Sequence, residues 1–595
     1  MEGITGEFYR QFALTIAAST IISGIVSLTL TPALAALFLK NTGRPDFFTR
    51  IYDFMLGRLF GAFNRGFEKI ADLYGKFVAA ALKIALPLLL LYAALLASTY
   101  FVFDSTPKGF IPAQDTCYFY VAVQLPDGAT LERTSEVMKK AEEVIGKTLP
   151  EAKKYMSLAG LNIANLGRGS NGGTMFIQLE PKEERVKKKI SLDDTVARLV
   201  DAFNREIPEA LFFIIKPPIV SGIGMGGDFK GYIQDRASHG IGEIEKRVKQ
   251  TVAETRKEKS VSTALTMFTI SCPRIYVDID REQAERMGVG IGSIFDAMRF
   301  NLGSTYINDF NILNRAYRVV AQAESANRAT PEDIMKLRVP AINGKFAQIG
   351  SVASLSRTVG PEIITRYNLY PAAEIMGNVS TGHSTGEAMA AIEKITDKNL
   401  PDGMDIEWTD LAFQEKRVGN TTAMVTFALC VIFVFLILAA LYESWRLPLS
   451  VILIVPLVLL FSILGVRGMN MDINVMTQIG FIVLIGLSCK NAILIVEFAK
   501  QRQERGEDAI KAVSAAARNR LRPILMTSFA FILGVTPLVV ASGTGSELRN
   551  ALGTPVFFGM LGVTAAGLVF TPVFFYVIRR HYKPSAKNIS EDIAK

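Results

Sequence analysis

The sequence has few of the residues on which metal and nucleophilic chemistry most often depends. It holds three histidines in 595 residues, and they form no cluster. Its four cysteines show no CxxC or other metal-binding spacing. The glycine-rich run at 221–227 lacks the lysine and the serine or threonine of a phosphate-binding loop, and it opens no helix. The sequence therefore predicts neither a metal site nor a bound cofactor.

The cysteines also give little support for a disulfide framework. Cys430 and Cys489 lie in apolar runs, where we expect them to be buried thiols. Cys117 and Cys272 lie outside such runs. They can pair only if the fold brings their Cα atoms within about 7 Å, a question that the sequence leaves open.

The charge is unevenly distributed along a chain that is half hydrophobic. The net charge is +9, yet much of it belongs to short loops beside apolar segments, so it does not point to nucleic acid. Seven segments are long and apolar enough to span a membrane. They are 12–39, 82–103, 420–441, 447–466, 474–498, 523–541 and 555–578. The basic loops alternate correctly if all are cytoplasmic, which places block 104–416 outside the membrane, in the periplasm of a Gram-negative cell.

A lysine in the fifth apolar segment stands out because no acidic residue lies at its depth. Lys490 is about 15 Å from water at either end, too far for its side chain to reach the surface. The nearest acidic residues, Glu443, Asp472 and Glu497, all fall at segment ends. Ionisable groups inside membranes usually mark ion or proton paths and face a counter-charge. Either Lys490 is neutral, or its partner belongs to another polypeptide.

The segment between the first two spans has a different pattern. Apolar residues recur every four positions, with basic residues between them. The apolar set is Phe47, Ile51, Met55, Leu59, Phe63 and Phe67, and the basic set is Arg50, Arg58, Arg65 and Lys69. This predicts an amphipathic helix on the cytoplasmic membrane surface. Packing into a soluble core is the alternative.

Two apolar segments end alike, which raises the possibility of an internal repeat. A Thr-Pro pair ends both, at Pro32 and at Pro572, and a basic residue follows eight positions later in each, Lys40 and Arg580. Two apolar helices can share such a pattern by chance. If the repeat is real, the first span closes one unit and the last span closes a second, as in transporters built from parallel repeats. The absence of a signal peptide before a first span with its start outside also suggests lost upstream sequence.

The block between the second and third spans alternates strands and helices. Strands are predicted at 117–125, 174–179 and 210–216, and helices at 132–145 and from a cap at Ser191 to Arg205. This order resembles a ferredoxin-like split βαβ unit. A second unit begins near residue 229 and resumes near 374, so residues 273–362 are predicted to be an inserted domain. The predicted fold is a helical membrane protein with a large periplasmic α+β region.

Several long motifs resemble one family. GLSCKNAILIVEFAK (486–500), RLRPILMTSFAFILGVTPLV (520–539), LAALYESWRLPLSV (438–451) and VQLPDGATLERT (123–134) are similar to the C-terminal half of a resistance–nodulation–division (RND) efflux permease of the hydrophobe/amphiphile branch. The Lys490-Asn491 pair favours organic substrates, because metal exporters carry a different motif there. The resemblance implies a multi-pass protein of the bacterial inner membrane.

The resemblance also implies a division of the chain. Residues 1–40 would be the last helix of a missing first repeat, 41–81 a cytoplasmic loop and 82–103 a span. Residues 104–416 would form porter subdomains with a docking domain inserted at about 273–362. Residues 417–582 would supply five spans, and 583–595 a cytoplasmic tail.

The family resemblance implies a secondary transporter rather than an enzyme. Such a permease is a homotrimer that exports small amphiphiles, uses the proton gradient in place of a cofactor, and works with a periplasmic adaptor and an outer-membrane channel. Its proton relay matches Lys490, Arg520 and Thr527 here, and the relay's aspartate pair would lie in the missing N-terminal half. A transport-incompetent truncated remnant and a metal- or cation-exporting RND subunit are the alternatives.

The resemblance implies substrate contacts as well. The distal pocket and switch loop match Met156, Leu161, Ile163, Arg168 and Phe176, and the entrance strand matches Phe212 and Phe213. Leu161 and Ile163 stand where multidrug members have phenylalanines, and the loop is two residues longer near 165–166. An aliphatic wall follows. For Phe212 and Phe213, ordinary strand core is an equal alternative.

Overall fold

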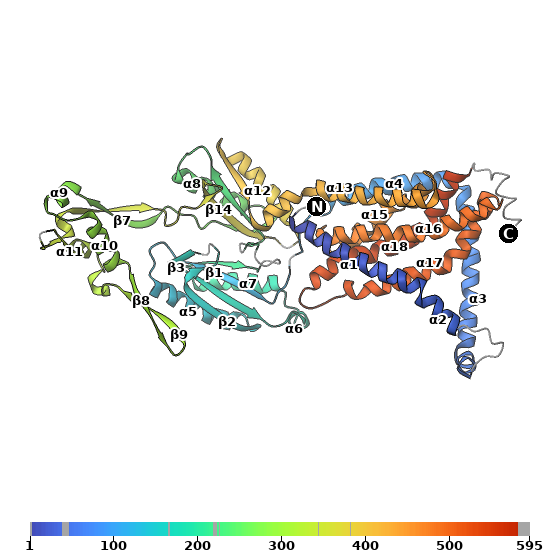
Figure 1. Ribbon diagram of the computed structural model, residues 1–595, viewed down its shortest axis with the longest axis horizontal. Coiled ribbons are helices and arrows are strands. Elements are labelled where there is room, and N and C mark those ends of the chain that lie inside the picture. The colour runs from blue at the N-terminus through green and yellow to red at the C-terminus, as the bar shows by residue number, and fades with distance from the viewer. Residues whose placement is uncertain are drawn as a thin grey trace.

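A computed structural model shows a bundle of long helices joined end to end with an elongated α+β part (Figure 1). It describes residues 3–38, 47–112, 114–164, 167–217, 223–224, 227–342, 344–380 and 382–580, with backbone alone for 38, 47–60 and 418–424. The predicted tail at 583–595 and the loop insertion at 165–166 lie outside the described residues.

Among the residues that the structure describes, 7 helical segments are long and apolar enough to cross a membrane, and they match the seven predicted spans. Several begin well before the predicted start. The helices are α1 (Gly3–Leu28), α2 (Leu30–Phe38), α4 (Ala85–Ser105), α13 (Asp410–Tyr442), α14 (Leu447–Ile452), α15 (Val455–Gly468), α16 (Val475–Glu504), α17 (Ala509–Val539) and α18 (Ser546–Arg579). α1 with α2 and α14 with α15 each form one span.

Small residues allow the central helices to approach closely. A Cβ on Gly562 would clash with the Phe461 ring, and one on Gly559 would clash with Ser462 Oγ. Ser462 itself donates a hydrogen bond of 2.9 Å to the Pro555 carbonyl. Small residues at the contacts and hydrogen bonds between helices are how membrane helices associate without a hydrophobic driving force. α18 is thus the hub on which α15 packs.

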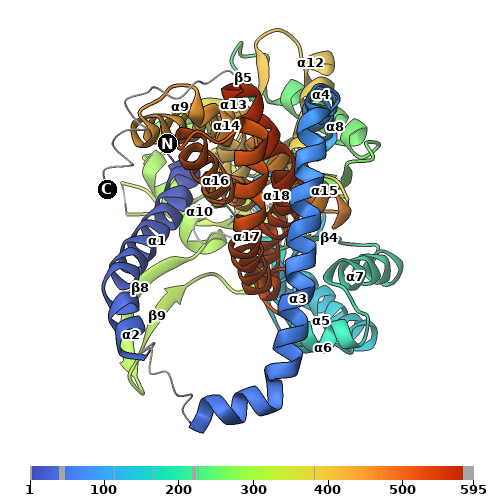
Figure 2. The same cartoon turned by 90° about the vertical axis from the view of Figure 1, so that its right-hand side faces the viewer.

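Helix α3 (Phe47–Lys83) crosses the end of the bundle that is farthest from the α+β part (Figures 1 and 2). The side chains of the predicted apolar repeat before residue 61 lie outside the described set. From residue 61 onward, Ala71, Val78 and Leu82 are buried, and the Tyr74 hydroxyl donates to the Leu568 carbonyl at 2.7 Å. α3 therefore packs on membrane helices, not within a soluble core.

The first α+β module has one more strand than the sequence predicted. Its elements are β1 (Tyr118–Gln124), α5 (Leu131–Thr148), β2 (Ala152–Asn162), β3 (Gly167–Leu179), α6 (Lys182–Lys187), α7 (Leu192–Glu206) and β4 (Leu211–Ile215). The antiparallel sheet has the order β2-β3-β1-β4. The missed strand, β2, is an edge strand with mostly exposed side chains, so it lacks an apolar alternation.

The second module repeats this arrangement. It contains β5 (Phe229–Asp235), α8 (Ile241–Thr255), β6 (Val261–Leu265), β13 (Arg366–Tyr367), β14 (Tyr370–Val379), α12 (Thr385–Asn399) and β15 (Met404–Trp408). β14 pairs with both β6 and β5, and β5 pairs with β15, giving the order β6-β14-β5-β15. Both modules thus have the strand order of a split βαβ unit.

A smaller domain at the far end interrupts the second module (Figure 1). β7 and β12 pair antiparallel to form its stem. It comprises β7 (Cys272–Ile279), α9 (Arg281–Arg286), α10 (Ile291–Leu302), β8 (Thr305–Ile312), β9 (Arg315–Ala321), α11 (Pro331–Lys336), β10 (Arg338–Pro340), β11 (Phe346–Gln348) and β12 (Ala353–Gly360). The four cysteines are free thiols, so the possible Cys117–Cys272 disulfide does not form in this structure.

Ion pairs tie the first module to the bundle. Arg185 is fully buried and places one guanidinium nitrogen 2.6 and 2.8 Å from the two Asp115 oxygens. Nearby, the Lys182 ammonium lies 2.5 Å from Glu547 and 2.7 Å from Ser546, at the start of α18. A buried charge needs a partner because its desolvation is costly. These contacts hold α6 against the membrane end of the module.

Replacing Arg185 tests this anchor. Arg185→Ala leaves the Asp115 carboxylate largely buried without its cation, which costs about 3–5 kcal/mol. Lys188→Ala is the matched control, because Lys188 and Glu180 form an ion pair in which the lysine is 53% exposed, and exposed pairs contribute at most about 1 kcal/mol. We expect faster proteolysis of the first module in Arg185→Ala at a temperature at which Lys188→Ala resists. Equal resistance of the two variants contradicts the anchor.

Candidate functional site

The three predicted relay residues lie on the adjacent helices α16 and α17. Lys490 is midway along α16, about 20 Å from either end at ~1.5 Å per residue. Its side chain is exposed on the bundle surface, and it has no hydrogen-bond or ion-pair partner among the described residues. No acidic residue stands at this depth in the described helices. In the described structure, as in the sequence, Lys490 therefore has no acidic residue at its depth.

A buried hydrogen bond fixes α16 beside α17 next to Lys490. The Asn491 amide donates to the Ser528 hydroxyl at 3.1 Å. Their chain neighbours, Lys490 and Thr527, consequently lie at the same level along the two helices. Thr527 donates within its own helix, to the Ile524 carbonyl at 3.1 Å.

Arg520 lies two turns before Thr527 on α17 and faces α16. Its guanidinium carbon sits 3.5 Å from the centre of the Phe498 ring, a close cation–π contact. The Arg520 Nε is buried without a hydrogen-bond partner in the described structure. A buried, unsatisfied donor carries a cost of about 1–3 kcal/mol. The structure thus brings Lys490, Arg520 and Thr527 onto one pair of helices, with both cations short of acceptors.

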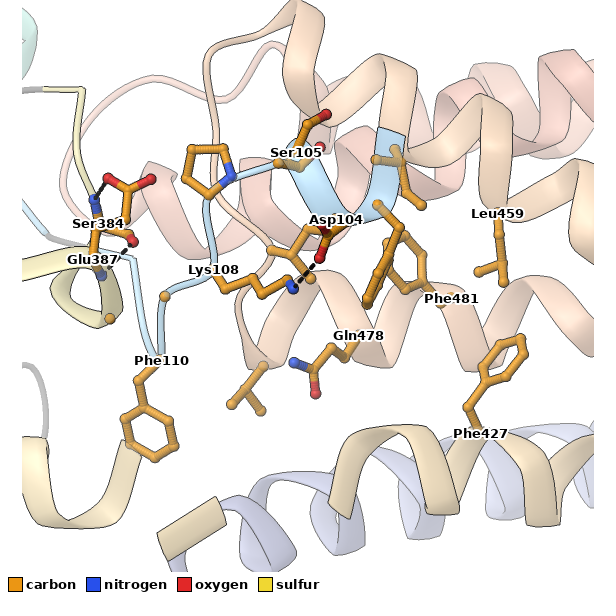
Figure 3. A pocket seen from close by; sticks show the side chains of 18 of the residues that line it. Asp104, Ser105, Lys108, Phe110, Ser384, Glu387, Phe427, Leu459, Gln478 and Phe481 are labelled. Carbon is orange, nitrogen blue, oxygen red and sulfur yellow. Dashed lines mark hydrogen bonds and ion pairs between the residues drawn. The ribbon is translucent and has the colours of Figure 1, made fainter. Parts of the chain in front are cut away.

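A cavity of about 840 Å³ opens at the junction of the bundle and the second module (Figure 3). Its membrane-side wall is apolar and comes from α4, α13, α15 and α16. Leu96, Phe103, Phe427, Leu459 and Phe481 contribute most clearly to this wall. Cavities of about 300–1,000 Å³ with apolar walls and a few polar groups are typical of small-molecule sites.

The opposite side of the cavity is polar and mainly acidic. Lys108 lies 3.6 Å from Asp104, and Lys416 lies 2.5 Å from Glu393. Glu387 caps α12 through Ser384, as the dashed lines in Figure 3 show. Both lysines are therefore occupied by carboxylates. The acidic groups outnumber the basic ones on this side.

Glu415 is the acidic group of the cavity without a basic partner among the described residues. It accepts one hydrogen bond, from the Thr385 hydroxyl at 2.6 Å. Burial, and secondarily the Asp472 carboxylate, raise the pKa of Glu415 from 4.5 to about 7, although the Thr385 hydrogen bond opposes this. The folded state thus binds the proton more tightly than the unfolded chain. Any resulting stabilisation is complete below pH 4.5 and is lost as the pH rises through about 7.

The predicted substrate contacts divide between the two faces of the first sheet. Ile163, Phe176 and Phe213 pack together on the face that meets Met376 of the second module. Met156 is opposite Phe176 in the strand register and thus shares that face. Leu161 pairs with Arg168 near the edge, and Arg168 is exposed.

Phe212 lies on the other face of the sheet. Its ring stacks on Phe203 of α7, with centroids 4.1 Å apart, and it packs against the main core of the module. The strand-core interpretation describes Phe212, whereas Phe213 points to the contact between the modules. The pocket assignment of the remaining residues stays a prediction.

The residues that line this cavity were not among the site residues predicted from the sequence. Glu415 lies ten residues before the apolar run that starts at Val425, so it was counted with the extramembrane block. Asp104 and Lys108 follow the second span and resembled ordinary boundary residues. One feature of the sequence could have indicated the site: Glu415 is a carboxylate on a helix, α13, that continues without a break into a membrane span.

Comparisons with known proteins identify the family. The AcrB/AcrD/AcrF family matches residues 1–579. The toluene efflux pump membrane transporter TtgB of a Pseudomonas putida strain is 36% identical over 579 residues, covering 97% of this chain and 54% of TtgB. The multidrug export protein AcrF of Escherichia coli is 35% identical over 584 residues, covering 98% of this chain and 55% of AcrF. The chain thus spans about half the length of the curated relatives it matches.

The family match also corrects the prediction of a C-terminal half only. It extends over residues 1–579, so nearly the whole chain has its counterpart in the family. The missing N-terminal half, inferred from the Thr-Pro repeat and the first span, is not supported by these findings. The family match, the helical bundle and the two α+β modules all indicate the same kind of protein. The chain belongs to the AcrB/AcrD/AcrF family of RND permeases, and it is an inner-membrane protein with periplasmic modules.

Proposed function

We propose that the chain takes part in proton-driven export of small amphiphilic molecules. The observation that carries the proposal is Lys490, an uncompensated cation midway along α16. A charge at this depth is costly and is retained where it serves ion movement. The relatives carry names such as toluene efflux pump and multidrug export protein, which supports organic substrates over metal ions.

In this mechanism Lys490 alternates between two environments. A partner polypeptide in the membrane contributes a carboxyl group. When this carboxyl group is ionised, it pairs with Lys490, and when it is protonated, the pair separates. Arg520 and Thr527 hold the positions next to this pair on α17. The carboxyl group binds its proton more tightly in the state in which it is separated from Lys490 than in the paired state. This difference in proton affinity supplies the free energy that drives the conformational change.

The cavity is the proposed entry site for the exported molecule. Its apolar wall faces the membrane helices, and its acidic side faces the periplasmic module. A buried apolar chain gains about 25 cal/mol per Å² of covered surface, and a cationic head group gains from Glu415, Glu387 and the neighbouring carboxylates. Amphiphiles with a positive head group are therefore the best match.

The wider assembly is part of the same proposal. A homotrimer with a periplasmic adaptor and an outer-membrane channel would carry the exported molecule past the outer membrane. The inserted domain lies at the far end of the molecule from the membrane (Figure 1), which suits contact with such partners.

The relay assignment predicts a sharp difference between two lysines of α16. Lys490→Met should reduce energy-dependent dye efflux at least tenfold, because it removes the cation that responds to the carboxylate. Lys500→Met is the matched control, since Lys500 lies near the end of the same helix and sits 5.6 Å from the Tyr442 ring. Efflux is measured in source cells with each variant at the natural locus and equal expression. Normal efflux in Lys490→Met overturns the relay.

The cavity assignment predicts a pH dependence. Because Glu415 has a pKa of about 7, it becomes charged as the pH rises through that value, and a cationic amphiphile should bind roughly tenfold more tightly at pH 8.5 than at pH 5.5, equivalent to one pKa unit. Glu415→Gln should flatten this dependence. Glu443→Gln, at the other end of α13, should retain it.

Binding is followed by the fluorescence anisotropy of a cationic amphiphilic dye with the full chain in lipid nanodiscs. A neutral amphiphile of equal length serves as the second control, and its affinity should not change with pH. A pH dependence that persists unchanged in Glu415→Gln contradicts the assignment.

A further inference from the structure

Helix α3 presents three distinct faces from residue 61 onward, and within the part of the chain that the structure describes only one of them is buried against other helices. Tyr74, Val78 and Leu82, with the buried Ala71, form the first face, and α3 packs against α17 and α18. The other two faces are exposed. One of these faces is basic and the other is apolar. A ligand that covers both must therefore carry a negative charge and an apolar part.

The basic face is a continuous stripe. Arg65, Lys69, Lys76 and Lys83 are all exposed, and at ~100° per residue they fall within about 40° of one another around the helix. Like charges four residues apart on a helix, as in Arg65 and Lys69, repel one another. Such an arrangement is stable when an anionic surface or ligand neutralises it.

Helix α17 widens this stripe with two arginines. Arg518 lies 2.5 Å from Asp72 of α3. Arg522 donates a hydrogen bond of 3.2 Å to Asn64 and sits 5.7 Å from the Phe67 ring. The acidic residues on this side of α3 are Glu68 and Asp72, and Asp72 is already occupied. The combined surface therefore has a positive excess.

The apolar face adjoins the stripe on its other side. Phe63 is 57% exposed, Ile70 57%, Leu73 70% and Phe77 51%. α3 crosses the end of the membrane bundle (Figure 2), and exposed apolar residues on such a helix suit the boundary between head groups and acyl chains. The periplasmic modules lie at the opposite end (Figure 1), so α3 is at the cytoplasmic leaflet.

We propose that α3 and the start of α17 form a docking surface for an anionic phospholipid of the cytoplasmic leaflet. The head-group phosphate lies on the basic stripe, within reach of Lys69 and Lys76, and the acyl chains lie along Leu73 and Phe77. Lysine and arginine are suited to this position, because their apolar stems follow the helix while their charged ends reach the head groups. The bound lipid links α3 to α17, the helix that carries Arg520 and Thr527.

The test uses the full chain in neutral detergent, titrated with phosphatidylglycerol or with phosphatidylcholine of the same acyl chains. Lipid binding is measured by native mass spectrometry and by the shift in melting temperature. We expect phosphatidylglycerol to bind at least tenfold more tightly than phosphatidylcholine, and this preference to weaken as salt is raised. Equal binding of the two lipids overturns the proposal.

Charge variants locate the lipid on this surface. The double variant Lys69→Gln/Lys76→Gln should lose about fivefold in affinity per lysine, on the order of 25-fold in total. Lys147→Gln/Lys187→Gln is the matched control, because it removes the same charge from exposed positions of the periplasmic module, and it should retain the preference. Equal losses in both double variants overturn the proposed location.

A third variant is expected to gain affinity. Asp72→Asn removes an acidic group from the stripe and releases Arg518, and both changes favour an anionic ligand. The Arg518–Asp72 pair is 52% exposed on each side, so little stability is lost. Inorganic phosphate at equal concentration should not displace the lipid, because it lacks the acyl contacts. Displacement by phosphate, or no gain in Asp72→Asn, contradicts the lipid assignment.

Discussion

The absence of water inside a bilayer is the constraint on which the rest of the structure depends. Within the hydrocarbon region, an unsatisfied polar group costs several kcal/mol. A helix satisfies its backbone groups internally, and some side chains of the bundle add hydrogen bonds between helices. Ser462 donates to the Pro555 carbonyl at 2.9 Å, and the Tyr92 hydroxyl donates to the Leu453 carbonyl at 2.7 Å, at the break between α14 and α15. Against this background Lys490 is exceptional, and its charge is the strongest pointer to function.

The same helices connect this charge to the periplasmic side. α16 begins at Val475, whose amide donates to the Phe110 carbonyl at 3.0 Å, and the preceding Ile473 amide donates to the Pro107 carbonyl at 2.9 Å. α13 continues from β15 of the second module, and Glu415 on this helix holds Thr385 of α12. Backbone hydrogen bonds therefore join the start of α16 to the segment 107–110 that lines the cavity, and a side-chain hydrogen bond joins α13 to the second module.

Much of the fold could be predicted because its physical signals are strong. The spans are apolar runs of sufficient length, and both modules show strand and helix periodicities, as with the cap at Ser191. β2 was missed because an exposed edge strand has no apolar face to reveal it. Lys490 could be singled out by its depth in an apolar run, whereas Arg520 and Thr527 were assigned to the proposed relay only through the family resemblance.

The cavity could not be predicted, because it depends on tertiary contacts between distant segments. Asp104, Glu387 and Glu415 are far apart in the chain, and only packing brings them to one opening. Phe212 and Phe213 illustrate a finer limit. They are adjacent, yet the strand directs one into the core and the other toward the second module, and the register that decides between them is set by pairing with β1.

The most direct test of the account is zero-length carbodiimide cross-linking in native membranes that export substrate. This reagent joins an amine to a carboxylate only when the two are in contact. The account predicts an isopeptide bond between the Lys490 amine and a carboxyl group of a membrane partner, detected by mass spectrometry. If Lys490 forms no such bond in active membranes, the proposed proton path is wrong.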